Sequence, residues 1–221
     1  MSHSIFTDSE WVPLFDQAGY SSFDDWWNAE NNLVETGNFR GPNSESSWSH
    51  VSRINLDCGR VVYLKRQQNH YPNNTLLKLL RTPTFKIEWK NYLAYKRAKV
   101  PTLNIVYFAS RKRDGNRQCI IVSEELKGMT PVYDLINSFK QYGWPPRKQR
   151  FAILGAIVKV VRQLHDAGMI HNALYSRHIY LNITIVNGQA VIPDHIQACL
   201  IDLMSFGCKL LISSFIFVTL L

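Results

Sequence analysis

The order of the predicted elements is the feature that most constrains the fold of this 221-residue chain. Segments rich in β-branched and aromatic residues, which favour strands, fill the first half and are interrupted by one helical segment. The predicted strands cover residues 34–40, 49–57, 60–66, 104–110 and 118–124, and the helix covers 85–99. The second half is mainly helical. This order predicts an α+β fold, in which a lobe built on an antiparallel sheet precedes a helical lobe.

Turn and capping residues agree with this order. Asp114-Gly115 predicts a tight hairpin, because both residue types tolerate positive φ. Thr130 as N-cap and Pro131 at the first helical position predict a helix start.

A longer helix is predicted over residues 147–167, and Gly168 is a natural C-terminal stop. Its predicted apolar face consists of Leu154, Ile157, Val158, Val161 and Leu164. Two short strands, 178–183 and 198–202, complete the second half, with a turn at 186–189 between them.

One lysine and one glutamate stand out by position. Strand alternation puts Lys65 on one face of its strand, and Glu88 follows 23 positions later on the predicted inward face of the next helix. That face follows the helical spacing of Phe85, Glu88, Tyr92 and Tyr95. A strand lysine paired with a helix glutamate is used to hold nucleotide phosphates in phosphoryl transfer. The alternative is that Lys65 is one of 25 basic residues and Glu88 is a solvated helix charge.

Asp202 ends the apolar run of the strand 198–202. A carboxylate at the end of a buried strand is costly unless it is paired or bound to a metal. Carboxylate oxygens suit Mg²⁺, so Asp202 is a candidate magnesium ligand. The alternative is an aspartate that only caps the strand end.

The segment "LHDAGMIHNALYSRHIYLN", residues 164–182, contains a helix end, a glycine, a histidine, a short loop and a strand. This is the order of a kinase catalytic loop, but Ala173 stands where the catalytic aspartate is expected. His171 is interpreted first as a structural residue of that loop. His178 stands where a second metal-binding asparagine is expected; a packed or hydrogen-bonded histidine is favoured over a ligand, because magnesium disfavours nitrogen.

Weaker signals complete the set of candidate nucleotide-binding residues. The loop before residue 49 has one glycine, but Ser46, Ser47 and its backbone amides could meet phosphate oxygens. Glu124 and Leu126 fall where two lobes would be joined and where backbone groups usually bond the adenine edge.

Charge and cysteine usage narrow the function classes. Residues 1–50 carry eight acids and one base, whereas the rest of the chain brings the net charge to +8. A basic body suits phosphate-bearing partners, although the acidic segment could simply cover part of it. Four separated cysteines without a Cys-x-x-Cys pair argue against a disulfide framework or zinc site and favour a reducing cytosol. The start of the chain lacks the pattern of a secretory signal.

Taken together, "VVYLKRQQNHY", "FKIEWKNYL", "IIVSEELKG", the segment 164–182 and "LIDL" resemble the bacterial lipopolysaccharide kinase family, in particular its InaA-like branch, related to kinases of the core heptose. The resemblance covers roughly residues 38–203. It implies a protein-kinase-like fold, ATP with Mg²⁺, and a cytoplasmic enzyme with peripheral contact to the inner membrane. The implied acceptor is a core sugar such as heptose, or another anionic acceptor.

Carried over residue by residue, the resemblance implies that Lys65 binds phosphate with Glu88 as its partner and that Asp202 binds magnesium. His171 corresponds to the catalytic-loop histidine. It also predicts an N-terminal extension over 1–37, a nucleotide-binding lobe over 38–126, a partial helical lobe over 127–203 and an apolar tail over 204–221. The apolar run over residues 210–221 is too short to span a bilayer and could be a buried strand or helix or a membrane-touching tail. Because composition changes abruptly after Leu203, a truncation or an altered reading frame is a further alternative.

Three functions stay open at this point. The first is a kinase-like phosphotransferase, whose activity in this form the absent aspartate puts in question. The second is a pseudokinase that binds nucleotide and acts as a stress-linked sensor or scaffold. The third is a nucleic-acid-binding protein, disfavoured because the sequence has no helix-turn-helix or aromatic-studded sheet pattern.

Overall fold

The protein is described from a computed structural model that covers residues 4–30, 32–39, 46–72 and 82–203. It divides into two compact units. Unit 1 comprises Met1–Lys90 and Leu103–Glu125, and unit 2 comprises Asn91–Thr102 and Leu126–Leu221. The helix α4 (Thr84–Arg97) contributes its first half to unit 1 and its second half to unit 2.

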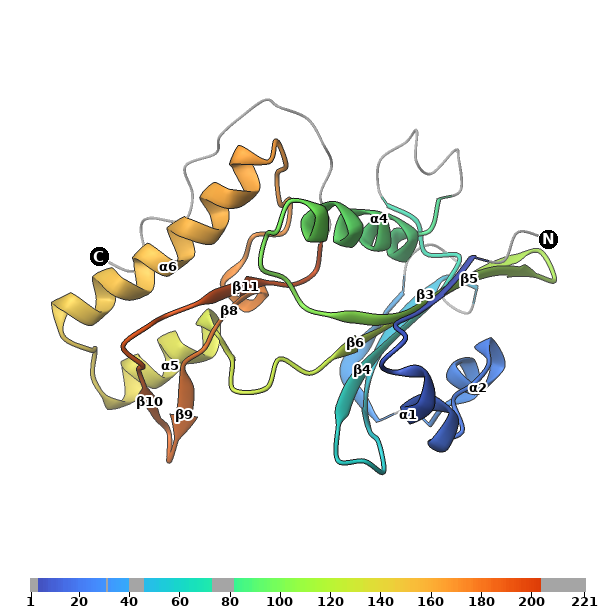
Figure 1. The fold of residues 1–221 in the computed structure, drawn as a ribbon, viewed down its shortest axis with the longest axis horizontal. Helices are drawn as coiled ribbons and strands as arrows, with labels where there is room; N and C mark the ends of the chain where they lie inside the picture. Colours follow the sequence, from blue (N-terminus) through green and yellow to red (C-terminus); the bar gives the residue numbers. More distant parts are fainter. Residues whose placement is uncertain (1–3, 31, 40–45, 73–81, 204–221) are drawn as a thin grey trace. The chain divides into compact units, whose positions relative to one another are not determined.

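Unit 1 is built on a six-stranded antiparallel sheet in the order β1-β5-β6-β4-β3-β2 (Figure 1). Its strands are β1 (Ser4–Thr7), β2 (Leu33–Phe39), β3 (Trp48–Asn55), β4 (Val61–Gln68), β5 (Ile105–Arg113) and β6 (Asn116–Glu124). The predicted Asp114-Gly115 hairpin joins β5 to β6, and both residues have positive φ, 51° and 79°. The predicted antiparallel sheet is therefore confirmed. β1 was not predicted, because four residues become a strand only through their pairing with β5.

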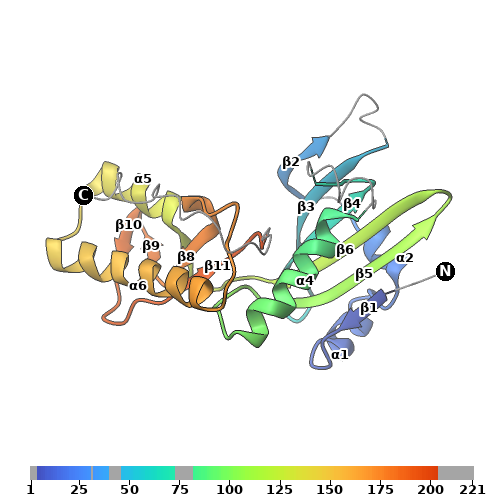
Figure 2. The same cartoon turned by 90° about the horizontal axis from the view of Figure 1, so that it is seen from above.

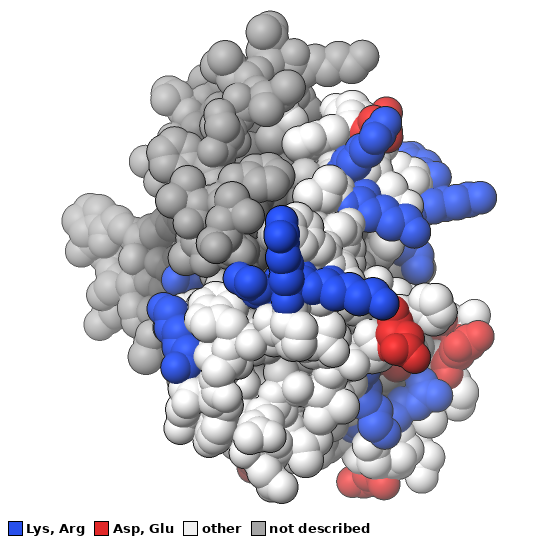
Figure 3. Space-filling view, turned by 90° about the vertical axis from the view of Figure 1, so that its left-hand side faces the viewer, with Lys and Arg blue, Asp and Glu red and all other residues white. Residues whose placement is uncertain are grey.

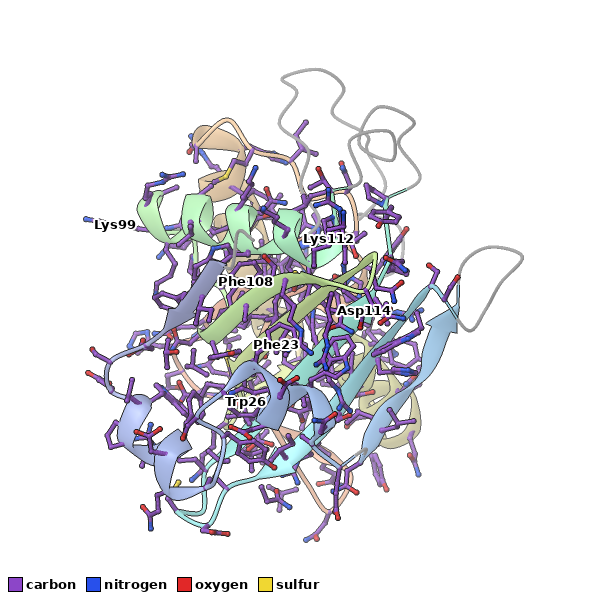
Figure 4. All side chains as sticks on the ribbon, turned by 90° about the vertical axis from the view of Figure 1, so that its right-hand side faces the viewer. Phe23, Trp26, Lys99, Phe108, Lys112 and Asp114 are labelled. Carbon is purple, nitrogen blue, oxygen red and sulfur yellow. The ribbon has the colours of Figure 1, made fainter. Side chains whose placement is uncertain are left out.

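The two faces of this sheet are covered by different helices (Figures 1 and 2). The short helices α1 (Val12–Gln17) and α2 (Phe23–Asn28) lie on one face, and the first half of α4 lies on the other. Figure 4 shows Phe23 and Trp26 on the α2 side, and Phe108 on the side of α4, where its ring stacks on Trp89 at 4.9 Å. Aromatic residues of the acidic N-terminal segment thus supply part of the core of unit 1.

Unit 2 combines helices with short strands. Besides the second half of α4, it contains α5 (Val132–Tyr142), α6 (Arg147–Asp166), the 3-10 turn η1 (Ser176–His178) and two small sheets. One sheet has the order β11-β8-β7, from Ala198–Leu200, Ile179–Leu181 and Thr130–Pro131; the other is the hairpin of β9 (Thr184–Val186) and β10 (Gln189–Val191). The turn predicted at 186–189 closes this hairpin, with Asn187 and Gly188 at positive φ.

Two local predictions in unit 2 were wrong: the first residue of α5 and the buried face of α6. α5 begins at Val132, because Thr130 and Pro131 pair with β8 as the strand β7. α6 buries Ile153, Ile157, Val160 and Leu164, whereas Val158 is 46% exposed. Residues 153–161 are apolar at most positions, so their spacing alone does not select one face.

Basic side chains outnumber acidic ones on the face of the molecule shown in Figure 3. This agrees with the positive charge of the chain beyond its first 50 residues. Within the described residues, no helix has both the length and the apolar composition that crossing a bilayer requires.

Candidate active site

Lys65 and Glu88 form an ion pair inside unit 1. The Lys65 Nζ lies 2.7 Å from the Glu88 Oε1. The side chain of Glu88 is 1% exposed and that of Lys65 is 16% exposed. A carboxylate buried to this degree needs a cation or several donors to offset its desolvation. The pair therefore holds a positive charge in a fixed position on the sheet face that α4 covers.

The alternation of β4 explains the direction of Lys65. Val62, Leu64 and Arg66 are buried on the face that packs against the core cluster of α1 and α2, so Lys65 points to the other face. Gln67, two residues further on, shares that face with Lys65. Its Oε1 accepts hydrogen bonds from the Thr84 hydroxyl and from the Phe85 N–H, 3.1 Å away.

The hydrogen bond from the Phe85 N–H to Gln67 fixes the beginning of α4 on the strand β4. The N–H groups of the first helical turn lack partners within the helix, and Gln67 supplies one from the strand. The Thr84 hydroxyl lies 2.9 Å from the Nδ1 of His70, which follows β4 directly. With the first turn anchored at Gln67, Glu88 lies one turn further along α4 and reaches Lys65. Sequence reasoning missed Gln67, Thr84 and His70; the signal was the position of Gln67, two residues after Lys65 on the same strand face.

On the opposite face of the sheet, Arg66 joins β4 to the end of α2. It is 4% exposed, and its Nη1 donates to the carbonyls of Trp27 at 2.6 Å and Ala29 at 3.0 Å. Burial lowers the pKa of Arg66 from its ordinary value. Consecutive basic residues of β4 therefore have separate tasks: Lys65 meets α4, and Arg66 fixes the end of α2.

Asp202 lies in unit 2, just beyond β11, and its side chain is 34% exposed. Its φ of 55° is in the left-handed region, which is uncommon for residues other than glycine and is better tolerated by Asp and Asn than by most others. The neighbouring backbone is held on both sides. The Ile201 N–H donates to the His178 carbonyl at 3.0 Å, and Asn91 Nδ2 donates to the Leu203 carbonyl at 2.6 Å. These bonds hold the turn that presents the carboxylate.

His171 connects the loop after α6 to this turn. Its Nε2 donates to the Ile201 carbonyl at 2.9 Å, and its Nδ1 accepts the Ala173 N–H at 3.1 Å. A carbonyl can only accept and an N–H can only donate, so these partners fix the neutral tautomer with the proton on Nε2. Burial lowers the pKa of His171, which favours the same neutral form. Both ring nitrogens are used for structure.

His178 holds the same alanine from the other side. Its Nδ1 donates to the Ala173 carbonyl at 2.6 Å, and its Nε2 lies 3.7 Å from the Asp202 Oδ2. The two histidines thus fix both polar backbone groups of Ala173, at the position where a catalytic carboxylate was expected. The loop keeps a defined backbone at this position although the methyl group of Ala173 can accept no proton.

The other predicted residues take part in separate hydrogen bonds. The Ser47 hydroxyl donates to the Asn69 carbonyl at 3.0 Å, and the Ser46 carbonyl accepts from Asn69 Nδ2 at 3.0 Å. Residues 40–45 of that loop lie outside the described residues. Glu124 ends β6, where its N–H donates to the Asn104 carbonyl at 2.9 Å, and the Leu126 carbonyl accepts from Met129 in a turn. Among the residues that the structure describes, no cluster of three or more His, Cys, Asp or Glu side chains could hold a metal ion.

Comparison with known proteins places this chain in a family. The sequence pattern of the lipopolysaccharide kinase (Kdo/WaaP) family matches residues 24–209. Protein InaA of Escherichia coli K12 is 28% identical over 166 residues, which are 74% of this chain and 73% of InaA. The lipopolysaccharide core heptose(I) kinase WaaP of Pseudomonas aeruginosa is 29% identical over 117 residues, 52% of this chain and 42% of that enzyme.

A solved structure supports the fold independently. The structure of WaaP in complex with acyl carrier protein matches this chain with a TM-score of 0.64 at 20% identity, over 93% of this chain and 73% of that one. The predicted α+β, protein-kinase-like fold is therefore confirmed, as is the resemblance noted in the sequence. The chain belongs to the lipopolysaccharide kinase (Kdo/WaaP) family.

Proposed function

We propose that this chain is an ATP-dependent phosphotransferase whose acceptor is a hydroxyl of a lipopolysaccharide core sugar, such as heptose. The observation that carries the proposal is the buried ion pair of Lys65 and Glu88 on β4 and α4. Family membership supports a kinase-like activity on the lipopolysaccharide core. The basic character of the chain agrees with an anionic partner.

The charges of the described residues fit a nucleotide with Mg²⁺. Lys65 carries a fixed positive charge that suits phosphate oxygens, and Glu88 keeps its side chain in one direction. Asp202 offers a partly exposed carboxylate, the type of ligand that magnesium prefers. Bound magnesium would neutralise charge that develops on the phosphates.

Each protein group then has a defined task. Lys65 binds phosphate, Glu88 orients Lys65, and Asp202 holds the metal. His171 and His178 fix the backbone of the loop at Ala173. Because Ala173 cannot orient or deprotonate the acceptor hydroxyl, charge stabilisation and positioning supply the rate enhancement. Absence of a general base typically lowers the rate by roughly 10²–10⁴-fold, so transfer is slow.

That same alanine favours a second candidate function, a nucleotide-binding pseudokinase acting as a sensor or scaffold. In this case Lys65, Glu88 and Asp202 retain their binding tasks, and turnover is lost. The two functions make the same prediction for nucleotide binding and opposite predictions for transfer to an acceptor.

Transfer from γ-³²P-labelled ATP to dephosphorylated lipopolysaccharide core oligosaccharide separates the two functions. The phosphotransferase predicts slow incorporation of label that requires the acceptor and is lost in Asp202→Asn. The pseudokinase predicts binding of the nucleotide without acceptor-dependent incorporation. Fast transfer that persists in Asp202→Asn would contradict the proposed tasks of the site.

A further inference from the structure

The nitrogen of His178 that faces Asp202 is available as an electron-pair donor. The Nδ1 of His178 lies 2.6 Å from the Ala173 carbonyl oxygen. Since a carbonyl oxygen only accepts, Nδ1 carries the proton, and Nε2 of the neutral ring keeps its lone pair. Metal-binding histidines usually have this arrangement, in which the second ring N–H donates to a backbone carbonyl or a carboxylate and fixes the tautomer.

The distance between the two side chains fits two ligands of one ion. Nε2 of His178 and Oδ2 of Asp202 are 3.7 Å apart. Two atoms each about 2.1 Å from a metal ion lie about 3.0 Å apart at a right angle and about 3.6 Å apart at 120°. The present separation matches ligands at about 120°, and at the right angle of an octahedral ion the two atoms would have to approach each other by about 0.7 Å.

The backbone keeps both side chains in place. Ile201 N–H donates to the His178 carbonyl, which ties the end of η1 to the turn of Asp202. Asp202 keeps the left-handed φ of 55°, a conformation that is uncommon for a non-glycine residue and recurs at functional sites. Both side chains are partly exposed, His178 at 16% and Asp202 at 34%, so an ion with phosphate or water as further ligands can reach them.

We infer that His178 and Asp202 together bind the divalent ion of the nucleotide complex, and that the imidazole ligand makes this site prefer Mn²⁺ over Mg²⁺. The inference rests on the proposed function, because two protein ligands require phosphate and water oxygens to complete the coordination. Magnesium disfavours nitrogen ligands, whereas first-row transition ions accept imidazole together with carboxylate. Mn²⁺ combines this tolerance with an affinity for phosphate oxygens.

Binding of the analogue AMPPCP with Mn²⁺ or Mg²⁺ to the EDTA-treated protein tests the preference. His178→Asn is the informative variant, because asparagine retains a donor for the Ala173 carbonyl and offers oxygen in place of nitrogen. His165→Asn, at an exposed position near the end of α6, is the matched control. Loss of a group that only orients a metal ligand usually lowers metal affinity by roughly tenfold or more, and loss of the ligand itself should cost at least as much. The ratio of Mn²⁺ to Mg²⁺ affinity should therefore fall about tenfold in His178→Asn and stay unchanged in His165→Asn.

Pulsed EPR of the Mn²⁺-AMPPCP complex detects the ligand directly. Histidine labelled with ¹⁵N distinguishes imidazole from the nitrogens of adenine. The inference predicts a ¹⁵N coupling of a bound histidine in the parent and in His165→Asn, and its loss in His178→Asn. If the parent binds the nucleotide with either ion but shows no histidine coupling and no change of ratio in His178→Asn, the inference is wrong and the proposed function stands. If the parent binds the nucleotide with neither ion, the proposed function has failed and the inference fails with it.

Discussion

Lys65 on β4 lies 2.7 Å from Glu88 on α4, and Glu88 is almost completely buried. Gln67, two residues beyond Lys65 on the same strand face, bonds the first turn of the same helix. Two contacts therefore set the position of α4 along β4, and the ion pair is one of them. Suitable variants separate this structural role of the pair from its proposed role in nucleotide binding.

Lys65→Met should destabilise the protein more than Lys65→Met combined with Glu88→Gln. The single variant leaves a buried carboxylate without its cation, and breaking a buried pair costs about 3–5 kcal/mol. The 16% exposure of Lys65 places the expected loss at the lower end of that range. In the double variant both sites are neutral, so most of the stability should return. Urea denaturation measures the free energies of unfolding.

Lys112→Met, at an exposed position of β5, is the control for loss of a strand lysine and should change stability little. Nucleotide binding should stay lost in the double variant although its stability returns. Equal instability of the single and double variants would mean that Glu88 is not stabilised mainly by Lys65.

Trp26→Ala should be strongly destabilising. Trp26 is fully buried, stacks on Tyr20 at 4.3 Å and meets Phe15 edge-on at 4.9 Å. Removing a buried tryptophan side chain costs about 3–5 kcal/mol. Trp144→Ala, at a side chain that is 43% exposed, should cost markedly less. If thermal unfolding shows equal losses, the N-terminal helices do not form part of the core of unit 1.

Thiol labelling should distinguish the cysteines of the described residues. Cys58 is exposed, whereas burial raises the pKa of Cys119 and of Cys199 to about 12 in each case. The thiolate is the reactive form, so iodoacetamide near pH 8 should modify Cys58 quickly. Cys119 and Cys199 should react only after unfolding, as followed by peptide mass spectrometry. Labelling of Cys119 at the rate of Cys58 in the folded protein would contradict the packing of β6.

The sequence predicted well what depends on local periodicity. The strand around Lys65, the helix face with Glu88 and the hairpin at Asp114 each follow from spacing or turn chemistry. Contacts between distant residues were not predictable from spacing alone. The bond from Gln67 to Phe85 and the position of His178 between Ala173 and Asp202 depend on how the chain folds back on itself.

The misplaced face of α6 has a related cause. Its run of apolar residues fits more than one helical face, and contacts with the rest of unit 2 select Ile153 and Val160. The catalytic tasks of Lys65, Glu88 and Asp202 stay predictions. The apolar tail predicted over 204–221 lies outside the described residues.

Ala173→Asp should raise the rate of transfer. The backbone of Ala173 is held at both polar groups by His171 and His178, so the new carboxylate would start from a fixed backbone position. A general base typically contributes roughly 10²–10⁴-fold, and an increase within that range is expected for transfer to the core oligosaccharide. Asn172→Asp, which adds the same charge at the exposed neighbouring position, should have no such effect. No gain in Ala173→Asp, with nucleotide binding intact, would mean that the carboxylate is not what limits turnover.

Calorimetric titration with Mg-ATP tests the central claim, that Lys65 and Asp202 serve a nucleotide and its metal ion. Lys65→Ala removes the phosphate-binding charge, and Asp202→Asn removes the metal-binding charge with a residue that tolerates the φ of 55°. The parent should bind ATP in a metal-dependent manner. Lys65→Ala should bind ATP at least about tenfold more weakly, because it loses a charged hydrogen bond worth about 1.5–3 kcal/mol. Asp202→Asn should lose the dependence of ATP binding on the metal. Failure of the parent to bind Mg-ATP, or unchanged binding in both variants, would contradict the claim.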